Sequence, residues 1–416
     1  MIVNLIKTTA LRLVDVVNKT LDPYDDFKRP FIPPPQSRPL WTIAPELHRL
    51  FTNQFTRPDG FVRYNVVNPD ENPDIGDLAL HQGLATATLA LGRSVGEVEP
   101  QELNSAAACH SKLFEKNKLI RGRSEKDPTM FEDDASNDSA TGQLLGVYFA
   151  ARYGGAQARV TSTTNITVLA NELIENNYSL VRQNGQPTTY GKLVNGVFTD
   201  PQRSSLILAI FKAAAILTGD PKYFTHFNSL YKKFGGLLRF AEFKFLDYTK
   251  SHETHRCAIH LHVLADCAMG RSDIAEQCAN GLRRIWNLHK KARDPWLATL
   301  VNRFWKIPDS EMRDVVNRLK EYPVTGKGPC VEQFNSAKAD YWKGFGIKFI
   351  EVNKTLRASQ PLPYHALPSQ DFWPQRHPFM CDAFKGKNET QIRHNPLDFL
   401  GPYWGLRNQN VISKDE

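Results

Sequence analysis

The segment ASNDSATGQLLGVYFAARYGG (residues 135–155) contains the pattern on which the fold prediction depends. Apolar and small residues recur with a helical period over 138–153, and Gly154-Gly155 follows as a stop signal. Comparable segments precede and follow it at short intervals along the chain. This helix is therefore predicted to be one member of a long helical series.

Helical periodicity, broken at short intervals, extends over most of residues 41–322. Proline stands in the predicted first turn at Pro201 and Pro221, and Asp220 precedes the second of these helices, as start signals do. Because most links are short, sequential helices are expected to be antiparallel neighbours. The predicted helices are 41–57, 76–93, 98–117, 138–153, 158–177, 201–219, 221–239, 253–268, 272–291, 294–306 and 309–321.

Such a succession of antiparallel helices allows two all-α architectures. The helices stack as an open solenoid, or they close into a double ring of inner and outer helices, an (α/α) toroid. A solenoid normally shows self-similarity with a period of about 30–45 residues, and this sequence shows none. We therefore predict an all-α fold, an (α/α) toroid.

Three segments differ from the helical series. Asn184-Gly185, between Leu180-Val181 and the strand-like residues 188–190, predicts a small β-hairpin. Residues 22–40 contain six prolines, and residues 361–407 contain seven prolines and many aromatic residues. The predicted division is an N-terminal helix with a proline-rich arm (1–40), a toroid body (41–360) and a C-terminal segment that wraps over the body as a lid (361–416).

The composition excludes several classes of protein. Of 416 residues, 41% are hydrophobic and 23% are charged, which rules out a disordered chain. No apolar run approaches the ~18 residues of a transmembrane helix, so no transmembrane segment is predicted. The 52 Lys and Arg residues exceed the 44 Asp and Glu residues and give a net charge of +8. No segment concentrates this charge between aromatic residues, so we predict no nucleic-acid partner and favour an anionic small ligand. The sequence does not assign the protein to a cellular compartment.

Neither the cysteines nor the histidines form a metal-binding pattern. The six cysteines include no C-x-x-C pair. The histidine-rich stretch SHETHRCAIHLH (251–262) lacks the H-E-x-x-H spacing of zinc proteases. We predict no metal and no cofactor.

Segments across most of 41–407 resemble the six-hairpin glycosidase-like superfamily of (α/α)-toroid proteins, and most of all a poorly characterised group within it. GDLALHQGLATATLALGR (76–93) resembles an early inner helix. Residues 135–155 and the following NELIENNYSLVRQNGQPTTYGKL (171–193) resemble a D-x-x-x-G-x-x-x-G helix and a G-x-P-T-x-(W/Y)-G hairpin. WPQRHPFMCD and NPLDFLGPYWGLRN resemble the group's ending, although His377 replaces an Asn and Gly401 replaces a Leu.

The resemblance implies a funnel-shaped cavity where the N-termini of the inner helices and their loops converge. In characterised toroid families such cavities serve glycoside hydrolysis, uronic-acid lyase or hydratase chemistry, or terpene cyclisation. The fold alone does not choose among these reactions.

Three residues are the predicted catalytic groups. Asp138 matches the acidic residue of the resembling motif, and Asp77 opens the predicted helix 76–93. The two carboxylates could face one glycosidic bond as acid and base, or each could instead cap its helix. His255 shares a helical face with other histidines and is the predicted assisting group, the alternative being a satisfied core histidine.

The predicted substrate-binding residues are aromatic or basic and lie mostly in segments that carry the resemblance. Flat aromatic faces stack on sugar rings, and arginine holds carboxylated sugars, although buried aromatic residues more often form core. These residues are Tyr190, Trp296, Trp373, Arg376, Tyr403 and Trp404.

The predicted function is a carbohydrate-active enzyme, a glycoside hydrolase or a uronate lyase-like enzyme, whose partner is a small molecule or an oligosaccharide. A non-catalytic binding or assembly toroid is the alternative. Terpenoid cyclisation is a minor one. Asn137, Asp138 and Thr141 match the start of a metal-binding run of terpene cyclases, but Leu145 stands where its closing Glu is expected.

Overall fold

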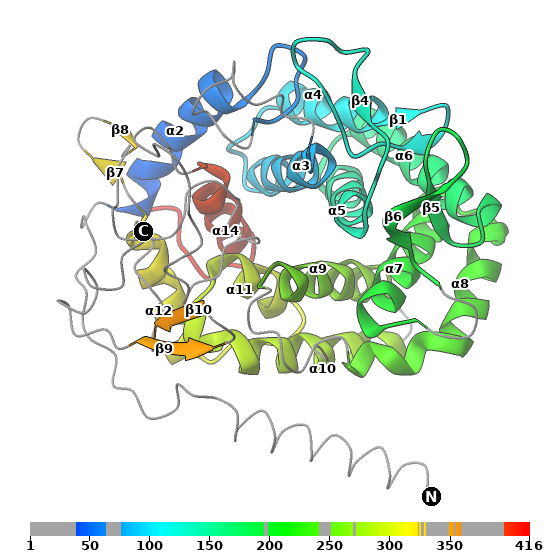
Figure 1. Cartoon of the computed structure of the whole chain (residues 1–416). Coiled ribbons are helices and arrows are strands. Elements are labelled where there is room, and N and C mark those ends of the chain that lie inside the picture. The colour runs from blue at the N-terminus through cyan, green and yellow to red at the C-terminus, as the bar shows by residue number, and fades with distance from the viewer. Residues whose placement is uncertain are drawn as a thin grey trace, which may run out of the picture.

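The computed structural model describes residues 39–63, 76–194, 199–240, 251–268, 272–322 and 395–416, together with four short strands between 324 and 358. Its helices form two concentric layers (Figure 1). The inner helices are α3 (Leu78–Ser94), α5 (Asn137–Tyr153), α7 (Pro201–Thr218), α9 (Ser251–Cys267), α11 (Pro295–Asn302) and α14 (Leu397–Asn408). The outer helices are α2 (Leu40–Leu50), α4 (Pro100–Ser111), α6 (Ala156–Glu175), α8 (Pro221–Phe234), α10 (Ser272–His289) and α12 (Asp309–Lys320).

The inner helices form a closed ring. Each packs on the next in the order α3, α5, α7, α9, α11 and α14, and α14 returns to α3. Each outer helix packs on an inner one, and α2 packs on α14, so the first and last described helices form one pair. The backbone N–H of Leu40 donates to the carbonyl oxygen of Glu416 at this junction, over 2.7 Å. The predicted all-α (α/α) toroid is confirmed.

The pattern of buried residues differs between the inner and the outer helices. In α3 every residue from Leu78 to Gly92 is buried, as expected of a helix enclosed by other helices. In α8 the buried side chains are Tyr223, Phe227, Leu230 and Phe234, which follow one face of the helix. In the part of the chain that the structure describes, no helix is long and apolar enough to span a membrane.

All inner helices run in the same direction. Three contacts show this for α5 and α9, because Asp138 contacts Arg256, Thr141 contacts His260 and Tyr148 contacts Asp266 in matching order. The N-termini of the inner helices therefore meet at one end of the ring and their C-termini at the other. We call these the N-terminal end and the C-terminal end.

Polar side chains fill part of the interior of the ring. His260 of α9 lies between the hydroxyls of Thr141 on α5, at 2.8 Å, and Ser205 on α7, at 3.0 Å. Nearer the C-terminal end, Asp266 accepts the hydroxyl hydrogen of Tyr148 at 2.8 Å and pairs with Arg152 and Arg303. These two networks bind α5, α7, α9 and the end of α11 together across the ring.

Short antiparallel β-hairpins connect or follow the helices. The predicted hairpin around Asn184-Gly185 is confirmed as β5 (Ser179–Val181) and β6 (Pro187–Lys192). The helix predicted to reach residue 117 ends at Ser111, because Lys116 and Asn117 have positive φ and turn the chain between two strands. The remaining strands are β1 (Phe114–Glu115), β2 (Lys118–Leu119), β3 (Gly122–Arg123), β4 (Phe131–Glu132), β7 (Val324–Thr325), β8 (Gly328–Pro329), β9 (Phe349–Val352) and β10 (Thr355–Ala358).

The structure differs from the sequence-based division near the end of the chain. The sequence predicts a wrapping lid over 361–416, yet α14 within this range is an inner helix of the ring. Its glycines explain this position, since a Cβ on Gly401 would lie 2.6 Å from the Trp296 ring and one on Gly405 would lie 2.3 Å from Thr299. Residues 361–394 and the predicted arm, apart from residues 39 and 40, lie outside the described residues.

Candidate functional site at the N-terminal end of the ring

The N-terminal end gathers the first turns of the inner helices. Unpaired backbone N–H groups and the helix dipoles make such helix starts favourable for negative charge. Asp77 and Asp138 stand at two neighbouring starts, on α3 and α5. This end of the ring is therefore where the predicted carboxylates lie.

Asp138 does not cap its helix. Ser136 is the N-cap residue of α5, and its side chain and that of Ser139 bond reciprocally to the backbone as a capping box. The Asp138 carboxylate instead pairs with Arg256 of α9, with Oδ1 and Nη1 2.7 Å apart. The Asp138 side chain is 26% exposed, so it keeps access to solvent while its charge is held by the guanidinium.

Asp77 also makes no capping hydrogen bond, although it occupies the N-cap position of α3. Its φ of 55° is a left-handed conformation that costs a non-glycine residue energy. The carboxylate accepts from Arg121, over 2.9 Å from Nε and 2.7 Å from Nη2. At 30% exposure the Asp77 side chain is accessible, much like that of Asp138.

Arg121 connects the two carboxylates electrostatically. Burial acts to lower the pKa of Arg121, but the charges of Asp77, Glu132 and Asp138 and the hydrogen bond that Arg121 donates to Asp77 outweigh burial and raise it. Glu132 lies 3.6 Å from the same guanidinium. One cation therefore interacts with three carboxylates, one from α5, one from the start of α3 and one from β4.

The cluster continues onto α9 and α7. Arg256 lies 3.6 Å from Glu253 on the same helix, and the amide of Gln202 on α7 donates to Glu253 over 3.2 Å. A chain of polar contacts thus crosses from α5 through α9 to α7. We call Asp77, Arg121, Glu132, Asp138, Gln202, Glu253 and Arg256 the N-terminal cluster.

His255 lies on another side of α9 from this cluster. It is buried, and its Nε2 contacts the carboxylate of Asp294, which caps α11 by accepting from the backbone N–H groups of Trp296 and Leu297. Burial, with the nearby His255 charge, lowers the pKa of His289 to about 4. The structure places His255 between α9 and α11, whereas Asp77 and Asp138 pair with arginines.

Of the predicted substrate-binding aromatics that the structure describes, Tyr190 lies apart from the other three, which belong to α11 and α14. Tyr190 on β6 is 59% exposed. Trp296, Tyr403 and Trp404 are buried between helices: Trp296 packs on Gly401, Tyr403 stacks on a neighbouring phenylalanine, and Trp404 meets His48 edge to face. Trp373 and Arg376 lie outside the described residues.

The sequence pattern does not mark Arg121, Arg256 or Gln202 as site residues. Arg256 follows His255 within the histidine-rich stretch, and its position one residue along the helix turns it toward α5 rather than α11. Arg121 lies between two short strands, where no helical period marks it. One signal could have pointed to Arg256. It is an arginine near the start of one inner helix, at the same level as a carboxylate at the start of another.

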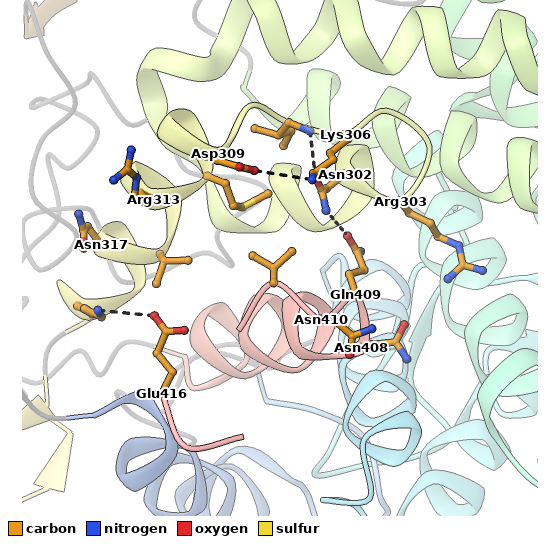
Figure 2. A pocket seen from close by; sticks show the side chains of 15 residues that line it. Asn302, Arg303, Lys306, Asp309, Arg313, Asn317, Asn408, Gln409, Asn410 and Glu416 are labelled. Atoms are coloured by element: carbon orange, nitrogen blue, oxygen red, sulfur yellow. Dashed lines mark hydrogen bonds and ion pairs between the residues drawn. The ribbon is translucent and has the colours of Figure 1, made fainter. Parts of the chain in front are cut away.

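The described residues also line two cavities away from this cluster. One, of about 880 Å³, lies at the C-terminal end of α11 and α14 (Figure 2). The other, of about 660 Å³, lies beside the hairpin of β5 and β6. Among the described residues, no three histidine, cysteine or acidic side chains are grouped so that they could hold a metal ion.

Two solved structures are similar to this chain at low sequence identity. A glycoside hydrolase family 76 mannosidase from Bacteroides thetaiotaomicron VPI-5482 shares 9% identity with a TM-score of 0.48, covering 89% of this chain and 99% of that chain. A family 76 glycoside hydrolase from a bovine Bacteroides thetaiotaomicron strain shares 10% identity with a TM-score of 0.49, covering 90% and 79%. No protein-family model and no curated protein matches the chain.

Proposed function

We propose that the protein is a carbohydrate-active enzyme, a glycoside hydrolase that acts on an oligosaccharide at the N-terminal end of the ring. The observation that carries the proposal is the pair Asp77 and Asp138. Both are partly exposed carboxylates at the starts of two adjacent inner helices, neither caps its helix, and each is held by an arginine. Two fixed carboxyl groups on one face are what glycoside hydrolysis requires.

The surrounding charges hold the two carboxyl groups in the same way. Asp138 faces Arg256 and Asp77 faces Arg121, and each arginine also lies 3.6 Å from a second acid, Glu253 or Glu132. One carboxyl group must act as the acid and the other as base or nucleophile. We assign the general acid to Asp77 and the base or nucleophile to Asp138.

The reaction then balances as a hydrolysis. Asp77 gives its proton to the glycosidic oxygen as the bond from that oxygen to the anomeric carbon breaks. Asp138 either takes a proton from the attacking water or forms the bond to the anomeric carbon that water later cleaves. Arg121 and Arg256 keep both carboxylates in place and offer N–H groups to sugar hydroxyls or to the carboxylate of a uronate.

Reducing-end release from a panel of neutral and uronate-containing oligosaccharides tests the proposal. Asp138→Asn and Asp77→Asn are each expected to lower the rate by about 10²–10⁴-fold. Asp415→Asn, at an exposed carboxylate outside the N-terminal cluster, is the matched control and should keep the wild-type rate. Full activity in Asp138→Asn would remove Asp138 from the mechanism.

The same panel separates the alternatives. A uronate lyase would release products with a new carbon–carbon double bond, which absorb in the ultraviolet, and hydrolysis produces none. Oligosaccharide binding by the wild-type protein with no product from any substrate would favour the non-catalytic binding toroid.

A further inference from the structure

The 880 Å³ cavity at the C-terminal end of the ring lies on the opposite end from the N-terminal cluster. Figure 2 shows Arg313 and Asn317 of α12 on one side of this cavity and Gln409 and Asn410, just after α14, on another. Its volume lies within the ~300–1,000 Å³ range of small-molecule sites. It is large enough for a ligand of one or a few sugar units.

The lining carries more basic than acidic side chains, and the basic ones other than Arg303 are neutralised only weakly. Arg313 is exposed and forms no ion pair with any residue that the structure describes. Lys306 lies 3.9 Å from Asp309, with both side chains more than four-fifths exposed, and Lys320 lies 4.0 Å from Glu416. Exposed pairs at such distances contribute little, so these cations remain available to an anionic ligand.

Amide side chains provide the rest of the polar lining, and two of them are held in place. Asn302 donates to Gln409 over 3.0 Å and accepts from the backbone N–H of Ile307 over 3.0 Å. Gln409 in turn donates to the carbonyl oxygen of Thr299 over 2.8 Å. Amides both donate and accept hydrogen bonds, as sugar hydroxyls also do.

We propose that this cavity binds an anionic sugar, a short saccharide that bears a carboxylate or a phosphate group. Arg313 holds the anionic group by a bidentate contact, and Lys306 adds positive charge. The amides of the lining, including Asn317 and Asn410, bind the hydroxyls. The site is distinct from the N-terminal cluster and does not depend on hydrolysis there.

Titration calorimetry on the full chain tests this site with three probes: glucuronate, a hexose 6-phosphate and glucose. One or both anionic probes are expected to bind and neutral glucose is not, and added salt should weaken the binding. A carboxylate preference or a phosphate preference identifies which anionic group the site takes. No binding of either anion to the wild-type protein would overturn the proposal.

Variants assign the bound anion to this cavity. Arg313→Gln should weaken binding at least about tenfold, because it removes a hydrogen-bonded charge. Arg283→Gln, at an exposed arginine on outer helix α10, is the matched control and should bind as the wild type does. Arg256→Gln should also leave this binding intact. If Arg256→Gln abolishes binding and Arg313→Gln does not, the anion binds at the N-terminal cluster and the proposal is wrong.

Discussion

Gly83 of α3 and Gly142 of α5 bring two inner helices into backbone contact. A Cβ on Gly83 would lie 2.1 Å from the carbonyl oxygen of Gly142, and a Cβ on Gly142 would lie 2.2 Å from the carbonyl oxygen of Ala79. No side chain can occupy this space unless one backbone moves away. Because the contact lies near the starts of both helices, it also fixes how Asp77 and Asp138 stand relative to each other.

Gly142→Ala should therefore destabilise the protein. The added methyl group meets backbone rather than a flexible side chain, so we expect a loss of about 1–3 kcal/mol or more in the free energy of unfolding. Gly155→Ala is the matched control, because a Cβ there meets no atom within 4 Å and the residue has an ordinary negative φ. Denaturant titration of both variants checks the difference, and equal midpoints would show that the helices are not in backbone contact.

Asp266→Asn should destabilise the C-terminal end of the ring. Asp266 is buried and pairs with Arg152 at 2.8 Å and Arg303 at 3.0 Å, so its replacement leaves two guanidinium groups without their carboxylate. Breaking such a buried arrangement typically costs about 3–5 kcal/mol. Asp309→Asn removes an exposed carboxylate and should stay within about 0.5 kcal/mol of the wild type in the same thermal or denaturant measurement.

His255→Gln distinguishes a structural role from a catalytic one. The buried contact with Asp294 predicts a fall of about 3–5 kcal/mol in stability. The remaining folded protein should keep most of its turnover. His48→Gln is the control, since it breaks a partly exposed pair with Glu102 and should cost no more than about 1 kcal/mol. Wild-type stability combined with lost turnover would instead support the acid–base role predicted for His255.

Acid should weaken the fold through its buried histidines. Burial lowers the pKa of His110, His262 and His289 from the ordinary value of 6.5 to about 4. Between pH 4 and 6.5 these histidines bind protons in the unfolded chain but not in the folded protein. Their contribution to the free energy of unfolding is therefore fully present above pH 6.5 and is lost as the pH falls toward 4. Each histidine contributes a slope of about 1.4 kcal/mol per pH unit.

The variant His110→Gln tests this origin of the slope. Unfolding free energies measured at several pH values between 4 and 7 should depend less on pH in the variant, by about one proton. The overall stability of the variant will also fall, because His110 bonds to Gln143 and Thr86. The slope is therefore the readout, and an unchanged slope would show that His110 is not the titrating group.

The sequence was sufficient for most helices and not for α14. Helical period and short links predicted the series that ends at Lys320, because those signals are local. In α14 the residues Gly401, Pro402 and Gly405 oppose helix formation by their own propensities. Glycine is required at 401 and 405 because the neighbouring helices leave no room for a Cβ there. This requirement arises from the packing of the ring, so the local sequence does not reveal it.

The candidate site was also predictable from the sequence only in part. Asp77 and Asp138 could be named from their positions at helix starts, and the structure finds them at one end of the ring. Their arginine partners could not, because Arg121 comes from a link between short strands and Arg256 from a helix that is distant in sequence. Which groups meet across a ring depends on how far each helix is rotated, and the sequence pattern does not contain that rotation.

Because α14 packs on α2 and α3, the ring cannot close during synthesis until the last described helix has been made. Helix α3 needs α14 as a neighbour, and α14 is made only after every other described helix has left the ribosome. Until then the flank of α3 that α14 will cover is an exposed, apolar surface, and contacts so distant in sequence form slowly. The contacts that α14 makes with α2 and α3 are therefore the last in the ring to form.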